Sequence, residues 1–179
     1  MRLKAIESPG DIRVKAAYLI SKIQYGKVLS ALKYIYSRSF PIMAASIKII
    51  NAEKKLKLPL RTKRFIRYYT AHLNECPFCS NGIEYLTAKD RIEFEEWKEF
   101  INFRESNRFD EKEKALLTYL EEINTTKSVT DYTFIELKKY YSEREIVEIT
   151  WINATENYFN LMAKPLGLKS DELEYKKNQ

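Results

Sequence analysis

The sequence is poor in the residues that tight turns need: its 179 residues include only four glycines and five prolines. Hairpins and β-bulges depend on glycine, so this scarcity argues against a β-rich fold. We find no sustained alternation of polar and apolar residues and no glycine-rich phosphate loop. The chain is instead rich in Lys, Glu, Leu, Ile and Tyr, with 45% hydrophobic residues, which favours long helices joined by short connections.

Cysteine and long apolar runs are also scarce. The two cysteines, Cys76 and Cys79, are too few for the disulfide framework of a small secreted protein. The longest apolar run, 41–47, is far too short to cross a bilayer, and the amino terminus has no signal-peptide pattern. We therefore expect a single-domain cytoplasmic protein that does not enter a membrane.

Positive charge is in excess, with a net charge of +6, and the excess is local. Between Lys48 and Arg67 there are eight Lys or Arg residues and one acidic residue, Glu53. Such a segment can steer an anionic substrate or an acidic partner, or it can be a solvated helix face. No zinc-finger or RNA-binding signature accompanies it, so we do not expect nucleic acid as a partner.

Apolar residues recur at helical spacing along most of the chain, which predicts an all-α bundle of roughly seven to nine helices. Capping signals mark several helix starts, at Asp11, Thr130, Asp110-x-x-Glu113 and Ser142-x-x-Glu145. The expected helices span approximately 12–25, 27–37, 41–53, 60–74, 77–86, 90–101, 110–123, 130–141 and 142–164.

The last of these helices carries two stripes. An apolar stripe with 4, 3, 4, 3 spacing predicts a packed face: Val147, Trp151, Ala154, Tyr158 and Leu161. A second stripe consists of Asn153, Asn157 and Asn160. It can be a polar lining of an active cleft, a hydrogen-bonded seam between subunits, or an exposed polar face.

The motif Cys76-x-x-Cys79 is the strongest candidate site. If Pro77 is the first helical residue, Cys76 is the N-cap, and the free backbone N–H groups of the helix start stabilise a thiolate. The three-residue spacing lets the second sulfur close a disulfide, as thiol redox chemistry requires. Two structural cysteines, or a zinc site that adds His72 and a further ligand, are the alternatives.

Two other side chains precede the motif on the same predicted helix. His72 can transfer a proton or stabilise a thiolate, or it can interact with the last carbonyls of its helix. Tyr68, one turn earlier, is either part of the site or a core or interface aromatic residue.

An ordered series of motifs surrounds the cysteines: 74–79 (NECPFC), 109–115 (FDEKEKA), 129–134 (VTDYTF), 141–147 (YSEREIV) and 157–160 (NYFN). Their order and spacing resemble the carboxymuconolactone decarboxylase-like superfamily, which includes alkylhydroperoxidase D. The resemblance covers roughly residues 60–168. It divides the chain into a helical lead-in, 1–59, that packs on the core, the core itself, 60–168, and a charged, frayed tail, 169–179.

The resemblance implies an all-helical protomer that assembles into homodimers, trimers or hexamers, with the cysteines near a subunit contact. It implies no metal and no cofactor other than the redox-active Cys76–Cys79 disulfide. The substrate is a hydroperoxide or a disulfide, and a thiol or lipoyl-type partner supplies electrons. In the peroxidase branch the second cysteine, here Cys79, attacks and the first, here Cys76, resolves. The N-cap argument instead favours Cys76 as the thiol of lower pKa.

The sequence departs from the family at the proton relay. The family has a glutamate twelve residues before the first cysteine and a histidine four after the second, where this chain has Arg64 and Ile83. Losing general acid–base help costs about 10²- to 10⁴-fold in rate. Either activity is weak, or His72, Tyr68 or Glu84 substitutes, while Arg64 can steer substrate and lower a thiol pKa by its charge.

We therefore expect a thiol-dependent antioxidant peroxidase or disulfide oxidoreductase. The alternative is a non-catalytic helical oligomer, an interaction or scaffold protein that retains the fold. The decarboxylase reaction is not expected, because that branch of the family lacks the cysteine pair.

Overall fold

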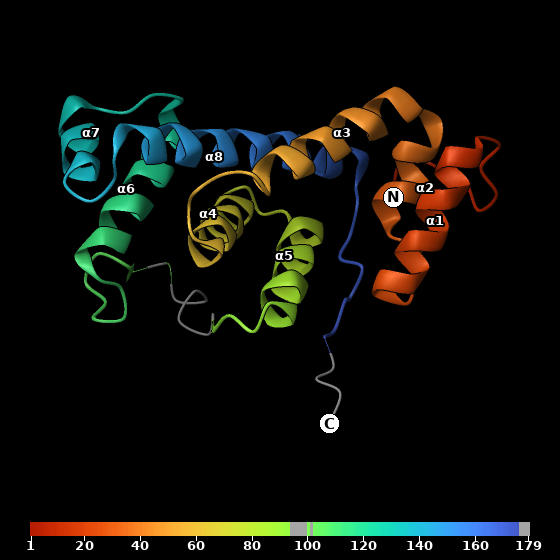
Figure 1. Ribbon diagram of the computed structural model, residues 1–179, viewed down its shortest axis with the longest axis horizontal. Coiled ribbons are helices and arrows are strands. Elements are labelled where there is room, and N and C mark those ends of the chain that lie inside the picture. The colour runs from red at the N-terminus through yellow and green to blue at the C-terminus, as the bar shows by residue number, and fades with distance from the viewer. Residues whose placement is uncertain (94–99, 101, 176–179) are drawn as a thin grey trace.

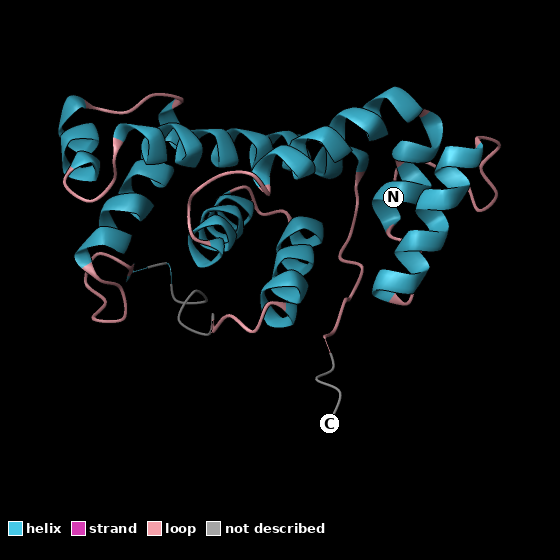
Figure 2. Cartoon of the chain, viewed as in Figure 1, coloured by secondary structure: helices cyan, strands magenta, loops and turns pink. Residues whose placement is uncertain are grey.

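The computed structural model describes residues 1–93, 100 and 102–175. Within these residues the chain forms eight α-helices and two 3-10 helices and no strand, which confirms the all-α prediction (Figures 1 and 2). The elements are α1 (Ile12–Tyr25), α2 (Ser30–Tyr34), η1 (Tyr36–Arg38), α3 (Phe40–Glu53), α4 (Leu60–Leu73), α5 (Pro77–Lys89), α6 (Glu111–Thr126), α7 (Asp131–Lys138), α8 (Glu143–Ala163) and η3 (Lys164–Leu166).

Two predicted helices need comment. The helix expected over 27–37 is broken into α2 and η1, with Ile35 between them. The helix expected over 90–101 falls largely on 94–99 and 101, which lie outside the described residues.

The helix starts predicted from capping signals, at Asp11, Asp110, Thr130 and Ser142, are confirmed. The Asp11 carboxylate accepts a hydrogen bond from the Arg13 backbone N–H at 2.8 Å, and both capping boxes, at 110–113 and 142–145, are complete. Gly26 ends α1 at a φ of 73°, a left-handed conformation that costs glycine little. Side-chain caps therefore satisfy backbone N–H groups at these helix starts.

Helix α8 runs along the length of the molecule, with α4 and α5 beside it, α6 and α7 at one end and α1 and α2 at the other (Figure 1). The core lies where α4, α6 and α8 meet. Its most deeply buried side chains on these helices are Phe65, Ile66, Leu116, Leu117, Leu120, Ile149 and Ile152. Full burial of one such side chain stabilises the fold by about 1.5–3 kcal/mol, so this junction fixes the orientation of α4.

The predicted packed face of α8 is wrong at its two ends. Val147 and Leu161 are 69% and 71% exposed, whereas Trp151 of the same stripe packs against the core together with the fully buried Ile149 and Ile152. Spacing identifies an apolar stripe but not the neighbour that will cover it. The neighbour, α4, presents polar groups, and these bury the polar stripe of α8 instead.

The asparagine stripe is not an exposed polar face. Asn153 and Asn160 are buried, and Asn153 accepts hydrogen bonds from the Thr70 hydroxyl and the Asn124 amide, both at 2.8 Å. The Asn74 amide donates to Asn157 at 3.0 Å and to Asn160 at 2.8 Å. These bonds join α4, α6 and α8 within one chain, so the stripe fastens the turn before Cys76 to α8.

The segment 1–59 contains a small apolar cluster of its own, formed by Val14, Tyr18 and Met43. The side chains of Ile35 and Leu58 instead join the main core. The segment 1–59 is therefore attached to the core by side-chain packing as well as by the polypeptide backbone.

The start of the C-terminal tail is hydrogen-bonded to the helical core, which corrects the expectation that the tail frays from residue 169. The Asp171 carboxylate accepts hydrogen bonds from the backbone N–H and hydroxyl of Ser30, and the Leu173 backbone exchanges two hydrogen bonds with the Asn81 amide. The tail thereby crosses from α8 to α2 and α5. No helix in the described part of the chain is long and apolar enough to cross a membrane.

Candidate active site at the start of α5

The two cysteines are joined in a disulfide at the start of α5, with their Cα atoms 5.3 Å apart. Helix α4 ends at Leu73, and the chain reverses through Glu75, whose φ of 48° is in the left-handed region. Cys76 is the N-cap and Pro77 the first residue of α5, as the sequence predicts. Cys79 lies in the first turn of that helix, within reach of Cys76.

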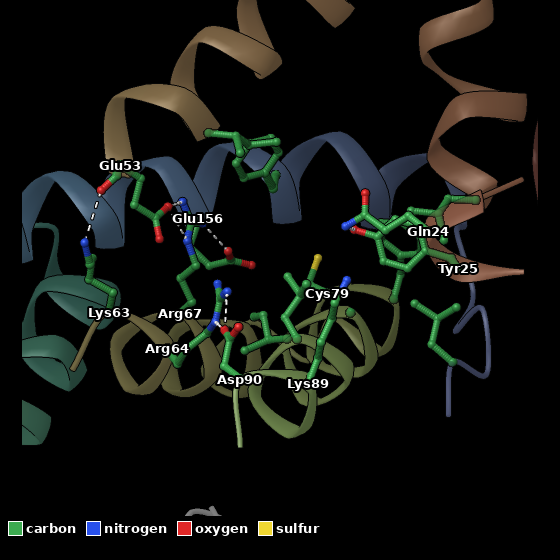
Figure 3. Close-up of a pocket in the computed structure, with 18 of the residues that line it drawn as sticks. Gln24, Tyr25, Glu53, Lys63, Arg64, Arg67, Cys79, Lys89, Asp90 and Glu156 are labelled. Atoms are coloured by element: carbon green, nitrogen blue, oxygen red, sulfur yellow. Dashed lines mark hydrogen bonds and ion pairs between the residues drawn. The ribbon is translucent and has the colours of Figure 1, made fainter. Parts of the chain in front are cut away.

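The two sulfur-bearing residues differ in their surroundings. Both are buried, but Cys79 borders a cavity of about 630 Å³, while Cys76 is not among the described residues that line it. Figure 3 shows the Cys79 sulfur pointing into this cavity. A small molecule in the cavity can therefore reach Cys79 directly.

Most of the cavity wall is apolar. The apolar and aromatic lining residues come from α1, α3, α4, α5, α8 and the segment between α1 and α3: Tyr25, Leu29, Tyr36, Ile50, Leu60, Phe78, Ile83, Leu86 and Phe159. Such a wall suits the organic part of a substrate, and the charged groups that lie together on one side of Cys79 in Figure 3 can orient it.

A buried cluster of charges, Glu53, Arg67 and Glu156, is among the charged groups that line the cavity. The Arg67 guanidinium donates from Nη1 to Glu156 Oε2 at 2.6 Å and from Nε to Glu53 Oε2 at 2.7 Å. Each of the three residues is at most 9% exposed. With both carboxylates ionised, these three side chains carry a net charge of −1, and the buried Lys63 ammonium donates to the Glu53 backbone carbonyl at 3.3 Å.

Burial and ion pairing act in opposite directions on this cluster. Burial raises the pKa of Glu156, although the charge and hydrogen bonds of Arg67 and a 2.7 Å hydrogen bond from the Asn160 amide favour the ionised form. Burial by itself lowers the pKa of Arg67, but the charges of Glu156 and Glu53 outweigh it and raise that pKa. The arginine is therefore permanently charged, while burial favours the neutral form of Glu156.

Of the side chains predicted to assist the cysteines, Arg64 shares their cavity. Its guanidinium is 2.8 Å from the Asp90 carboxylate, an ion pair that joins α4 to the end of α5 (Figure 3). Ile83, at the position of the family histidine, also lines the cavity.

The other predicted side chains lie elsewhere. The Tyr68 hydroxyl donates to Glu84 at 2.9 Å, and neither residue is among the described residues lining the cavity. His72 is exposed, and its ring is 5.7 Å from that of Phe100. The structure thus brings Arg64 and Cys79 to one cavity but not His72, Tyr68 or Glu84.

Sequence reasoning missed the charged cluster. Two signals pointed to it: Glu53 is the one acidic residue in the basic segment 48–67, and Glu156 lies within the asparagine stripe of α8. The basic segment is not entirely a solvated face, because Lys63 and Arg67 are buried. Across the described residues, no three His, Cys, Asp or Glu side chains are grouped as a metal ion would require.

The fold and site together define a class: an all-helical protein with a Cys-x-x-Cys disulfide at a helix start beside a largely apolar cavity. No family model and no curated protein matches the sequence. Several solved structures, however, match the fold of this chain. An uncharacterized peroxidase-related protein from Ralstonia eutropha, described as an alkylhydroperoxidase AhpD core, has a TM-score of 0.80 at 15% identity, covering 96% of this chain and 92% of that chain.

Two further structures agree. A protein of unknown function from Agrobacterium tumefaciens, described as a candidate AhpD antioxidant defence protein, is 24% identical with a TM-score of 0.67, covering 79% of this chain and 96% of that one. The debrominase Bmp8, a cysteine-to-alanine variant in complex with 2,3,4-tribromopyrrole, is 16% identical with a TM-score of 0.78, covering 96% and 92%. This chain therefore has the AhpD-like helical fold, and the resemblance inferred from its motifs is confirmed at the level of the fold.

Proposed function

We propose that this protein is a thiol-dependent peroxidase or disulfide oxidoreductase that works through Cys76 and Cys79. The observation that carries the proposal is the position of Cys79, which borders a cavity while remaining bonded to Cys76 in the first turn of α5. The likeness to AhpD and to a peroxidase-related protein supports the same class of chemistry.

The different positions of Cys79 and Cys76 relative to the cavity indicate which cysteine attacks and which resolves. In the reduced protein the Cys79 thiolate attacks the distal oxygen of a hydroperoxide, the O–O bond breaks, and Cys79 becomes a sulfenic acid as the alcohol leaves. The Cys76 thiolate then attacks the Cys79 sulfur, which forms the disulfide and releases water. A thiol or lipoyl-type dithiol returns two electrons and two protons. Because Cys79 rather than Cys76 borders the cavity, we assign the attack to Cys79.

An apolar cavity of this size suits an organic hydroperoxide better than hydrogen peroxide. A second candidate is reductive dehalogenation of a small aromatic compound: the dithiol supplies two electrons and two protons, the carbon–halogen bond breaks, one proton adds to the ring carbon, and halide leaves with the other as the disulfide forms. The aromatic lining, which includes Tyr36, Phe78 and Phe159, and the tribromopyrrole bound to Bmp8 favour including this reaction in a substrate panel.

We also propose that the protein is a homo-oligomer and works in the cytoplasm, where reducing partners return the disulfide to the dithiol. Exposed apolar side chains on α1 support the first part. Four of them recur on one face of the helix: Ile12, Ala16, Leu19 and Ile23.

The test is to reduce the protein, remove the reductant and add one equivalent of cumene hydroperoxide. We expect both thiols to disappear together, and dihydrolipoamide to sustain turnover. Cys79→Ser should abolish consumption, because the attacking sulfur is gone. Cys76→Ser should consume one equivalent and stop as a sulfenic acid that dimedone traps.

The matched control is Ser80→Ala, one residue beyond Cys79, which should keep wild-type turnover. If Cys79→Ser consumes peroxide as fast as the wild type, the assignment is wrong. If the wild-type thiols survive every hydroperoxide and halogenated pyrrole, the non-catalytic oligomer is the better description.

A further inference from the structure

Cleavage of a hydroperoxide at Cys79 needs a proton, because an alkoxide is a poor leaving group. Neither position of the family relay can supply it: Ile83 has no proton to give, and the guanidinium of Arg64 does not release one at neutral pH. His72, Tyr68 and Glu84 lie away from the described lining of the cavity. The protein has the nucleophile in place but lacks the usual proton donor.

The described acidic residues that line the cavity are Glu53, Asp90, Glu156 and Asp171. Asp90 is engaged by Arg64, and Asp171 holds the backbone and hydroxyl of Ser30. Glu53 and Glu156 both bind Arg67 through Oε2. Glu156 projects from α8, and Figure 3 shows its carboxylate and the Cys79 sulfur both pointing into the cavity.

We propose that Glu156 donates the proton taken up by the leaving oxygen when Cys79 cleaves a hydroperoxide, and that Arg67, Asn160 and Glu53 hold it in position for this. The inference rests on the peroxidase function proposed above. It gives a role to a buried acid on a helix that does not carry the cysteines.

The contacts of Glu156 hold its carboxyl group in position, whereas burial and the charge of Glu53 favour its protonated form. Arg67 on α4 donates a hydrogen bond to Glu156 Oε2 at 2.6 Å, and Asn160 on α8 donates one to Oε1 at 2.7 Å. The Glu53 carboxylate on α3 accepts a hydrogen bond from the same Arg67 guanidinium. Because two buried carboxylates share one cation, protonating one of them makes the cluster neutral. Burial also favours the protonated form, because it raises the pKa of Glu156.

The protons balance within one cycle. Cys79 gives up a proton when its thiolate forms, and Glu156 carries one. The thiolate attacks the distal oxygen, the electron pair of the O–O bond leaves with the alkoxide, and Glu156 protonates it to the alcohol, directly or through one water molecule. The Glu156 carboxylate then accepts the proton that the next Cys79 thiol releases.

The experiment compares two oxidants whose leaving groups differ in basicity. tert-Butyl hydroperoxide leaves as an alkoxide and needs the acid, whereas peracetic acid leaves as a carboxylate and does not. We expect Glu156→Gln to lower kcat/KM for tert-butyl hydroperoxide by about 10²- to 10⁴-fold and to leave peracetic acid reduction nearly unchanged. Glu84→Gln, which removes a carboxylate that does not line the cavity, should be unaffected with both oxidants.

A second variant tests the positioning role through the pH profile. Glu53→Gln removes the second negative charge beside Arg67, which should lower the pKa of Glu156. As the pH rises, Glu156 should then lose its proton at a lower pH than in the wild type. Turnover with tert-butyl hydroperoxide should therefore begin to fall at a lower pH. With peracetic acid the profiles of the two proteins should coincide.

The outcomes separate the two proposals. If the wild type reduces neither oxidant, the peroxidase function fails. If it reduces both, and Glu156→Gln loses the same factor with each or loses nothing with either, the role of Glu156 fails while the function stands. Should Glu156→Gln not fold, an unshifted Glu53→Gln profile would overturn the proposal.

Discussion

At the scale of single residues, the decisive feature is that one arginine serves two buried acids. Arg67 holds Glu53 on α3 and Glu156 on α8, so it joins two helices that otherwise present like charges to one another. Buried ion pairs add little net stability because desolvation offsets the attraction, but breaking one is costly. The cluster therefore adds little net stability, and its consequence for the site is that it places Glu156 at the wall of the cavity that Cys79 borders.

Replacing Arg67 should destabilise the protein strongly. Arg67→Met leaves two carboxylates buried without a cation, and we expect the free energy of unfolding to fall by about 3–5 kcal/mol in urea titrations at neutral pH. The loss should shrink as the pH falls, since protonating either acid removes the repulsion. The control is Arg61→Ala, whose partner is Glu113 and whose side chain is 46% exposed, with a cost of about 0–1 kcal/mol. Equal costs for both variants would contradict this account.

At the scale of elements, α8 is the helix on which the site depends. It carries Glu156 and the asparagines that fasten the turn before Cys76, and its outer side presents Val147 and Leu161 to the surface. Its start is fixed by Ser142, whose side chain accepts the Glu145 backbone N–H, while the Glu145 carboxylate accepts the Ser142 backbone N–H at 2.8 Å. The position of the charged cluster therefore depends on a local capping signal.

Removing this cap should cost stability without touching the site. We expect Ser142→Ala to lower the free energy of unfolding by about 0.5–2 kcal/mol, because the backbone N–H of Glu145 loses its partner. Ser8→Ala, an exposed serine outside any helix, is the matched control and should be neutral. Chemical denaturation of the three proteins with an unchanged m-value measures the difference; an effect no larger than that of Ser8→Ala would argue against the cap.

At the scale of the whole molecule, helix α1 has an apolar face that the described residues of the chain leave exposed. Val14 and Tyr18 belong to the small N-terminal cluster. On the opposite side of the helix, the side chains of Ile12, Leu19 and Ile23 are each at least 60% exposed. An apolar face of this length on one helix is typical of a contact between subunits. This supports the proposed homo-oligomer.

Charging this face should therefore lower the oligomeric state. We expect Leu19→Lys with Ile23→Lys to shift the mass measured by light scattering toward the 21.3 kDa of one chain, because lysine ammonium groups resist burial. The matched control places two lysines on exposed apolar positions of α7, Tyr132→Lys with Ile135→Lys, and should not change the mass. A wild-type protein that is already monomeric, or a change with the α7 pair alone, would contradict the assignment.

The sequence by itself determined the helical class, the helix starts and the place of the cysteines. These depend on neighbours within one or two turns: Ser142 needs only Glu145 to form its capping box, and Pro77 needs only its own ring to begin a helix after Cys76. The ordered motifs also indicated the AhpD-like fold, which the solved structures bear out.

Only the tertiary structure decided which stripe of α8 is buried, and which acids line the cavity that Cys79 borders. Helical spacing gives two possible faces, and the choice depends on what the facing helix offers. Arg67 and Thr70 on α4 draw Glu156 and Asn153 inward and leave Val147 outside. Arg67 lies 89 positions from Glu156 in the chain, so no local pattern links them, and buried charges meet wherever the packed helices bring their partners together.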